Sequence, residues 1–95
     1  MEIRISPSAR EETTAAARYY EEEVDGLGKA FMEALRVGFR RIRKYPQAST
    51  LLRGDYRRHL LDRFPFGIIY RIDSDVITVV AIMHLRRKPD YWLSL

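Results

Sequence analysis

Apolar and polar residues alternate over residues 2–6, and the alternation ends at Pro7, which predicts a short strand followed directly by a helix. Ser8 and Glu11 have the spacing of a capping box, so we expect this helix to begin at Ser8 and to run to about Glu23. Small and apolar residues recur along it at helical spacing and predict one buried stripe, made of Ala9, Thr13, Ala16, Tyr20 and Val24.

A second helical pattern follows the break at Asp25-Gly26 and runs from Leu27 to about Tyr45, where Pro46 ends it. Its predicted core face holds Leu27, Phe31, Ala34, Leu35, Gly38, Ile42 and Tyr45. Its opposite face is mostly basic and holds Lys29, Glu33, Arg36, Arg40 and Arg43. Because the connection is short, we expect the two helices to pack as an antiparallel hairpin.

After Pro46 the pattern becomes typical of strands, over residues 56–61, 67–73 and 76–84, with a tight turn at Asp73-Ser74-Asp75. The last two runs are apolar on both faces in places, as in central strands that lie under helices. These elements predict an α+β fold in the order β-α-α-β-β-β: an N-terminal strand, the helical hairpin and a three-stranded antiparallel meander. The helices should cover one side of the sheet, and a short C-terminal tail follows.

Length and composition narrow the classes of protein. A chain of 95 residues fits one domain, residues 1–95. No apolar run approaches the length of a membrane span and no secretory signal is evident, so we expect a cytoplasmic protein. The absence of cysteine excludes disulfides and thiolate ligands. His59 and His84 lie on separate segments without metal-binding spacing, so we expect no metal and no cofactor.

Charge is unevenly distributed along the chain. The first 35 residues carry eight acidic and four basic side chains, whereas the remainder carries five acidic and thirteen basic ones. The C-terminal part should therefore attract an anionic partner. Nucleic acid and an acidic protein both meet that description, and charge alone does not separate them.

Several runs of residues resemble motifs of the RelE/ParE toxins of bacterial toxin-antitoxin systems, and of the ParE branch in particular. They are Tyr19-Tyr20-Glu21 followed by Gly26-Leu27-Gly28 and Phe31, Phe64-Pro65-Phe66 followed by Ile69-Tyr70-Arg71, and His84-Leu85-Arg86-Arg87-Lys88-Pro89-Asp90-Tyr91-Trp92. The resemblance covers essentially the whole chain and keeps the segments in order. It implies the same β-α-α-β-β-β fold and the toxin role in a type II toxin-antitoxin pair.

The resemblance implies two alternative activities. RelE-type toxins cut mRNA in the ribosome, which requires an acid or base near a cluster of cations. For that alternative the catalytic candidates are His84, Arg71, Arg58 and Tyr91. Residues 45–85 contain no lysine, unlike the lysine-rich sites of several such nucleases.

ParE-type toxins block DNA gyrase without acting as nucleases, and the branch that the sequence resembles favours this hypothesis. Such a toxin needs a rigid, partly basic surface in place of a catalytic cluster, and arginines and aromatics are the usual anchors of interfaces. The binding candidates are Arg57, Arg63, Arg86, Arg87, Trp92, Arg36 and Arg40. We expect Arg57, Arg58, Arg71, His84, Arg86, Arg87, Tyr91 and Trp92 to gather at one end of the sheet.

The resemblance also implies a partner, a cognate antitoxin whose C-terminal part is disordered when free and folds over the toxin in a heteromeric complex. Acidic and apolar side chains of the antitoxin would suit the basic part of this chain. A third hypothesis is an inactive homologue that only binds an antitoxin or itself. Such a protein would be harmless when expressed alone.

Overall fold

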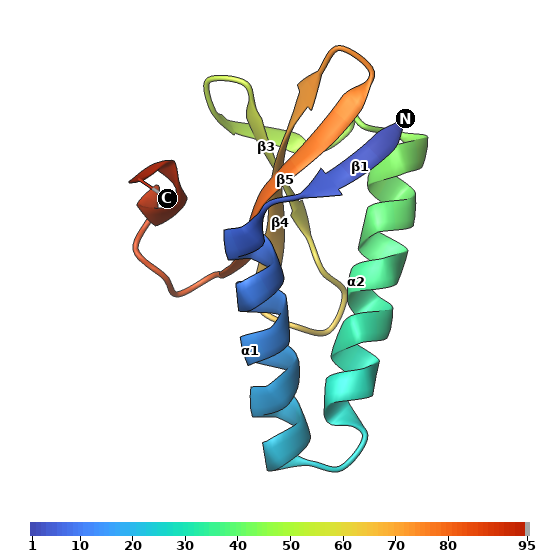
Figure 1. Cartoon of the computed structure of the whole chain (residues 1–95), viewed down its shortest axis with the longest axis vertical. Helices are drawn as coiled ribbons and strands as arrows, with labels where there is room; N and C mark the ends of the chain where they lie inside the picture. The colour runs from blue at the N-terminus through green and yellow to red at the C-terminus, as the bar shows by residue number, and fades with distance from the viewer. Residues whose placement is uncertain (95) are drawn as a thin grey trace.

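The computed structural model describes residues 1–94 and has two helices on one side of a five-stranded sheet (Figure 1). The elements are β1 (Glu2–Ile5), α1 (Pro7–Glu23), α2 (Leu27–Lys44), β2 (Thr50–Arg53), β3 (Tyr56–Leu60), β4 (Phe66–Asp73), β5 (Val76–His84) and the short 3₁₀ helix η1 (Tyr91–Ser94). The predicted α+β class and the order of its elements are confirmed. No helix within residues 1–94 has the length and apolar character needed to cross a membrane.

The sheet has the strand order β1-β5-β4-β3-β2, so the first strand lies beside the last one. β1 is parallel to β5, and the other neighbours are antiparallel. The meander has four strands where the sequence predicted three, because β2 forms the outer edge beside β3. All four residues of β2 are exposed, so Thr-Leu-Leu-Arg lacks the alternation that identifies a half-buried strand.

The first helix begins at Pro7, one residue earlier than the sequence predicted. Its N-cap is Ser6, whose hydroxyl oxygen accepts a hydrogen bond from the backbone N–H of Ala9 at 3.1 Å. Pro7 then occupies the first helical position, where a backbone N–H would have no acceptor within the helix, so proline loses no hydrogen bond there. The predicted cap at Ser8 was wrong because Ser8 already lies inside the helix.

Replacing Ser6 with alanine should lower the free energy of unfolding by about 1 kcal/mol, as is usual for the loss of an N-cap. The Ser6 hydroxyl also donates to the carbonyl oxygen of Val80 at 3.3 Å, which the variant loses as well. Urea denaturation measures the change, with Ser8→Ala as the matched control. Equal effects of the two substitutions would contradict the assignment of the cap.

The turn between α1 and α2 is stabilised by hydrogen bonds between a side chain of α1 and backbone N–H groups at the start of α2. Gly26 has φ +87°, a conformation that favours glycine, and it caps α2 without a side chain. The carboxylate of Glu21 takes over that role by accepting hydrogen bonds from the N–H groups of Gly26 at 2.9 Å and Gly28 at 3.0 Å. A negative charge at the start of α2 is also favoured by the helix dipole.

The main core lies between the helical hairpin and the sheet. Four aromatic rings meet at one end of it, with Phe31 centred 5.3 Å from Phe64 and 5.1 Å from Phe66 and with Tyr20 against all three. Burial raises the pKa of Tyr20. Two predicted core residues were wrong, because Val24 is 58% exposed and Tyr45 is 62% exposed. Both are C-caps, where the chain leaves the buried face of its helix.

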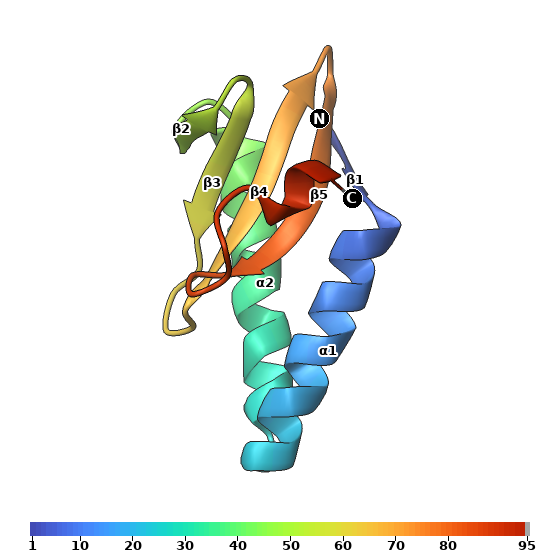
Figure 2. The ribbon, with the colours of Figure 1, turned by 90° about the vertical axis from the view of Figure 1, so that its left-hand side faces the viewer.

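A smaller apolar cluster covers the opposite face of the sheet, where the predicted tail folds back as η1. Figure 2 looks onto this face and shows the C-terminal segment crossing in front of β4 and β5. Trp92 is 4% exposed and packs with Ile69, Ala81 and Met83. Its ring also lies 4.6 Å from that of Tyr56. The tail is therefore part of the folded structure.

His59 on β3 carries a buried Nε2 atom that has no hydrogen-bond partner in the described part of the chain. Burial lowers the pKa of His59 below its ordinary 6.5, and the nearby Arg41 lowers it further, whereas Asp62 opposes the change. The unfolded chain therefore takes up a proton at a higher pH than the folded protein does. The contribution of His59 to the free energy of unfolding should therefore be fully present above about pH 6.5. It should decline as the pH falls toward the pKa of His59 in the folded protein.

Replacing His59 with glutamine should remove this decline. Urea denaturation at about pH 7 and about pH 5.5 measures it, because few carboxyl groups titrate in that interval. The wild-type protein should lose more stability between the two conditions than His59→Gln does. Parallel losses would show that another group is responsible.

Candidate functional site

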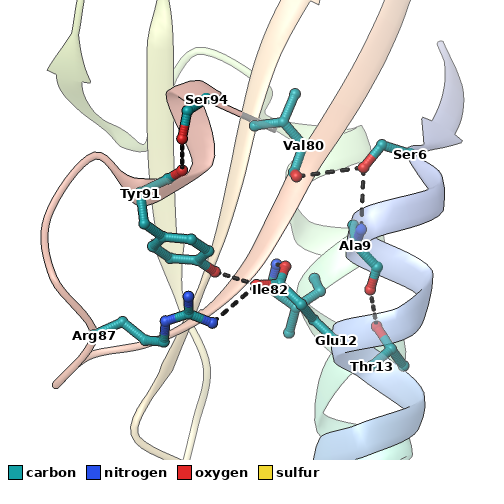
Figure 3. Close-up of polar contacts among 9 residues, drawn as sticks. All are labelled: Ser6, Ala9, Glu12, Thr13, Val80, Ile82, Arg87, Tyr91 and Ser94. Atoms are coloured by element: carbon teal, nitrogen blue, oxygen red, sulfur yellow. Dashed lines mark hydrogen bonds and ion pairs between the residues drawn. The ribbon is translucent and has the colours of Figure 1, made fainter.

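A carboxylate on α1 joins three parts of the molecule that are far apart in the sequence (Figure 3). Glu12 Oε1 accepts a hydrogen bond from the backbone N–H of Ile82 at 2.9 Å, and Glu12 Oε2 accepts one from the hydroxyl of Tyr91. Arg87 Nη1 lies 3.9 Å from the same Oε2, and its guanidinium carbon lies 3.8 Å from the centre of the Tyr91 ring. Glu12 thereby ties the C-terminal segment to α1 and β5.

The strand pairing explains why α1 supplies this carboxylate. β1 ends at Ile5 opposite Val79, so β5 continues beyond its neighbour with an open backbone edge. The hydroxyl of Ser6 and the carboxylate of Glu12 bond this edge at Val80 and Ile82. Only 17% of the Glu12 side chain is exposed, and both of its carboxylate oxygens accept hydrogen bonds.

The hydroxyl of Tyr91 serves as a donor in this network. Burial raises the pKa of Tyr91, the hydrogen bond to Glu12 and its charge raise it further, and Arg87 only partly opposes them. Tyr91 therefore stays protonated at neutral pH and positions the C-terminal segment.

His84 lies at the end of β5, next to this network. Its ring centre is 5.0 Å from that of Phe66, in an edge-to-face arrangement. Its Nδ1 accepts a hydrogen bond from the backbone N–H of Arg86 at 3.0 Å, so a neutral imidazole carries its proton on Nε2. Within residues 1–94, no group of three His, Asp or Glu side chains is close enough to hold a metal ion.

Arg71 and Trp92 lie on the face of the sheet that the helices leave uncovered. Arg71 donates through Nε to Asp73 at 2.9 Å and through Nη1 to the hydroxyl of Tyr56 at 2.9 Å. Trp92 is buried against Tyr56 and is not available for stacking on a ligand. Arg58 is half-buried, and its side chain lies over Gly67, where an added Cβ would come within 2.8 Å of its Cγ. These side chains chiefly stabilise the sheet.

The candidate residues do not form the single cluster that we expected. Arg71 is opposite Thr78, whereas His84 is opposite Phe66 at the other end of β4. Six residues of an extended strand separate Thr78 from His84, which is roughly 20 Å. His84, Arg87 and Tyr91 come together around Glu12, and Arg71 lies apart from them.

The remaining arginines are dispersed. Arg57 bonds the backbone carbonyls of Gln47 and Ser49 at 2.9 and 2.8 Å, which attaches the segment before β2. Arg36 is paired with Glu33 through two hydrogen bonds. Arg63, Arg40 and Arg86 are exposed at the surface. Exposed arginines are available to a partner, whereas Arg57 has a structural role.

Two grooves flank α1. The larger, of about 830 Å³, lies between α1, α2 and the end of β1 and has mostly apolar walls that include Ile5, Leu35 and Phe39. Arg10, Lys29, Glu33 and Arg36 also line it. The smaller, of about 390 Å³, lies on the other side of α1 and is lined by Glu12, Ala15, Ala16, Tyr19, Tyr20, Phe66, Ile82, His84 and Arg87.

Sequence reasoning missed Glu12 as a functional candidate. The residue has a helical spacing to Ala16 and Tyr19, which shows that it borders the apolar stripe of α1. That spacing does not reveal its partners, because Ile82 and Tyr91 are 70 and 79 residues away. Only the fold brings them together.

Comparisons with known proteins identify relatives of this fold. The model of the family described as "ParE toxin of type II toxin-antitoxin system, parDE" matches residues 3–89. The solved structure titled "Chromosomal ParDE TA system from P. aeruginosa" contains a similar chain, with a TM-score of 0.67 and 16% sequence identity. The match covers 90% of the present chain and 97% of that chain. No curated protein matches the sequence.

Proposed function

We propose that this chain, which belongs to the ParE toxin family of type II toxin-antitoxin systems, stops bacterial growth by inhibiting DNA gyrase and is neutralised by a cognate antitoxin. The observation that carries the proposal is the match of residues 3–89 to the model of the ParE toxin family. The site agrees with it, because Arg71 lies far from His84, and Arg87, which is near His84, is paired with the Glu12 carboxylate. A nuclease site needs its acid or base beside the cations that stabilise the phosphate. A gyrase inhibitor needs only a rigid surface that fits a large protein.

A paired assay tests this proposal. The purified protein is added to a DNA gyrase supercoiling reaction and, separately, to a cell-free translation reaction whose mRNA is followed by primer extension. We expect loss of supercoiling or accumulation of cleaved DNA, with intact mRNA. Cut mRNA with normal supercoiling would instead establish the RelE-type activity, and no effect in either assay would favour the inactive homologue.

For neutralisation, we propose the larger groove as the binding surface of the antitoxin. Its apolar walls suit the buried side of an amphipathic helix, and Met32 presents a further apolar surface there, being 45% exposed. Arg10 and Lys29 at the same groove suit acidic residues of the partner.

Replacing Thr14 with tryptophan should weaken antitoxin binding about tenfold or more, because the exposed Thr14 lines this groove and the larger ring would obstruct part of it. Calorimetric titration of the toxin with its cognate antitoxin measures the effect. Arg18→Trp is the control, since Arg18 is exposed on the same helix and lines neither groove. Unchanged affinity of Thr14→Trp would place the antitoxin elsewhere.

A further inference from the structure

The smaller groove is lined by aromatic, small apolar and polar side chains. Tyr19, Tyr20 and Phe66 give it aromatic sides, and Ala15 and Ala16 leave space between them. Tyr19 is 59% exposed although its ring lies edge-on to that of Tyr20, with centroids 5.4 Å apart. An exposed aromatic side chain beside a concave apolar surface is typical of a recognition site.

The polar groups of this groove that can still form further hydrogen bonds are the donors of Arg87 and His84. Arg87 is 54% exposed, and its carboxylate neighbour Glu12 already accepts from Ile82 and Tyr91. The Nδ1 atom of His84 is occupied by the N–H of Arg86, which leaves Nε2–H as the free donor of the neutral ring. The groove therefore complements a ligand that brings an acceptor, above all a carboxylate, next to an apolar group.

We propose that the smaller groove is a second docking site, used for the target enzyme, and that it receives from gyrase a large apolar side chain next to an aspartate or glutamate. The inference rests on the proposed gyrase inhibition and adds the surface that carries it. Arg87 pairs with the carboxylate of the target, and Glu12 acts as a positioning residue that holds Arg87, together with the Tyr91 ring against which it packs, beside the groove.

A protein segment fits this groove better than a nucleotide does. The rings of Tyr19 and Tyr20 are inclined by 71°, which leaves no slot between parallel faces for a base. An apolar side chain can bind without a slot between parallel rings.

The first test fills the groove. Ala15 is exposed and lines it, so Ala15→Trp should block the site without disturbing the core. We expect the concentration of toxin that half-inhibits purified gyrase to rise about tenfold or more, with Tm and antitoxin affinity unchanged. Arg18→Trp, on the same helix and outside both grooves, should behave as wild type.

The second test reverses the charge at the mouth. Arg87→Glu should raise the half-inhibiting concentration by a similar factor, and Arg18→Glu makes the same charge change away from the groove. Glu12→Gln should raise it less, because the amide still contacts Tyr91 but no longer attracts Arg87. Tm and antitoxin affinity, measured for each variant, show that the fold is retained.

The outcomes separate this inference from the one on which it rests. If the wild-type protein leaves supercoiling intact, the proposed function is wrong. If the wild-type protein inhibits gyrase and Ala15→Trp inhibits it equally well, the groove is not the docking site. Loss of antitoxin affinity alone in Ala15→Trp would assign the groove to the antitoxin, and tighter binding of a single-stranded oligonucleotide than of gyrase would assign it to nucleic acid. Either result overturns the inference.

Discussion

Replacing Phe31 with alanine should lower the free energy of unfolding by about 3–5 kcal/mol, the usual range for a buried aromatic residue. The Phe31 side chain is fully buried and contacts three other aromatic rings, so its removal leaves a cavity at the junction of α2 and the sheet. Domains of this size have only about 5–15 kcal/mol of stability in total. Urea denaturation should show a midpoint lower by 1 M or more, given slopes of about 1–3 kcal/mol per molar.

Tyr19→Ala is the control for this prediction. Tyr19 is also aromatic and also belongs to the hairpin motif, but it is largely exposed. Its removal should change the free energy of unfolding by no more than about 0.5 kcal/mol. Similar losses in the two variants would mean that the aromatic cluster does not form the core as described.

The second large effect is expected at Gly28, where alanine should destabilise the protein by about 1–3 kcal/mol although alanine is normally the better helix former. An added Cβ would lie 2.5 Å from the backbone carbonyl oxygen of Ala17, so α1 and α2 would have to separate. The shift would also strain the hydrogen bond from the Gly28 N–H to Glu21. Thermal unfolding followed by circular dichroism measures the change.

Gly38→Ala is the matched control, a glycine in the same helix with the same substitution. Its Cβ would meet the side-chain ends of Ile68 at 2.9 Å and Leu61 at 3.2 Å, and these ends can rotate away. The gain in helix propensity, about 1 kcal/mol, should offset most of that cost. If Gly28→Ala proved as stable as Gly38→Ala, close contact between the helix backbones would not explain the glycine at position 28.

The elements that the sequence predicted correctly have a strong periodic pattern. In α2 the apolar residues recur on one face, and Phe31, Leu35 and Ile42 are all buried in the structure. β2 was missed because an exposed edge strand has no buried face to create a pattern. The error at Ser8 has a similar origin, since two serines flank Pro7 and the capping box selects the wrong one.

The candidate site was less predictable because it depends on pairing between distant segments. A slip of one register changes which side chains share a face, and the sequence alone does not determine the register of a meander. The structure places His84 with Arg87 and Tyr91 but separates them from Arg71. The burial of Trp92 could not be predicted from the sequence either, because this residue follows a run of polar residues.

The pairing of β1 with β5 has a consequence for how the protein folds during synthesis. Among the strands within residues 1–94, β1 is made before all the others and pairs with β5, the one made after all the others, with Glu2 opposite Val76 and Ile5 opposite Val79. Contacts between residues so far apart in the chain require a large loop to close and form slowly. On the ribosome, the helical hairpin can form early, whereas the sheet must wait until the last strand has left the exit tunnel. Both grooves beside α1 include residues of β1 or β5, so the nascent chain acquires these binding surfaces only after β5 has been made and has paired with β1.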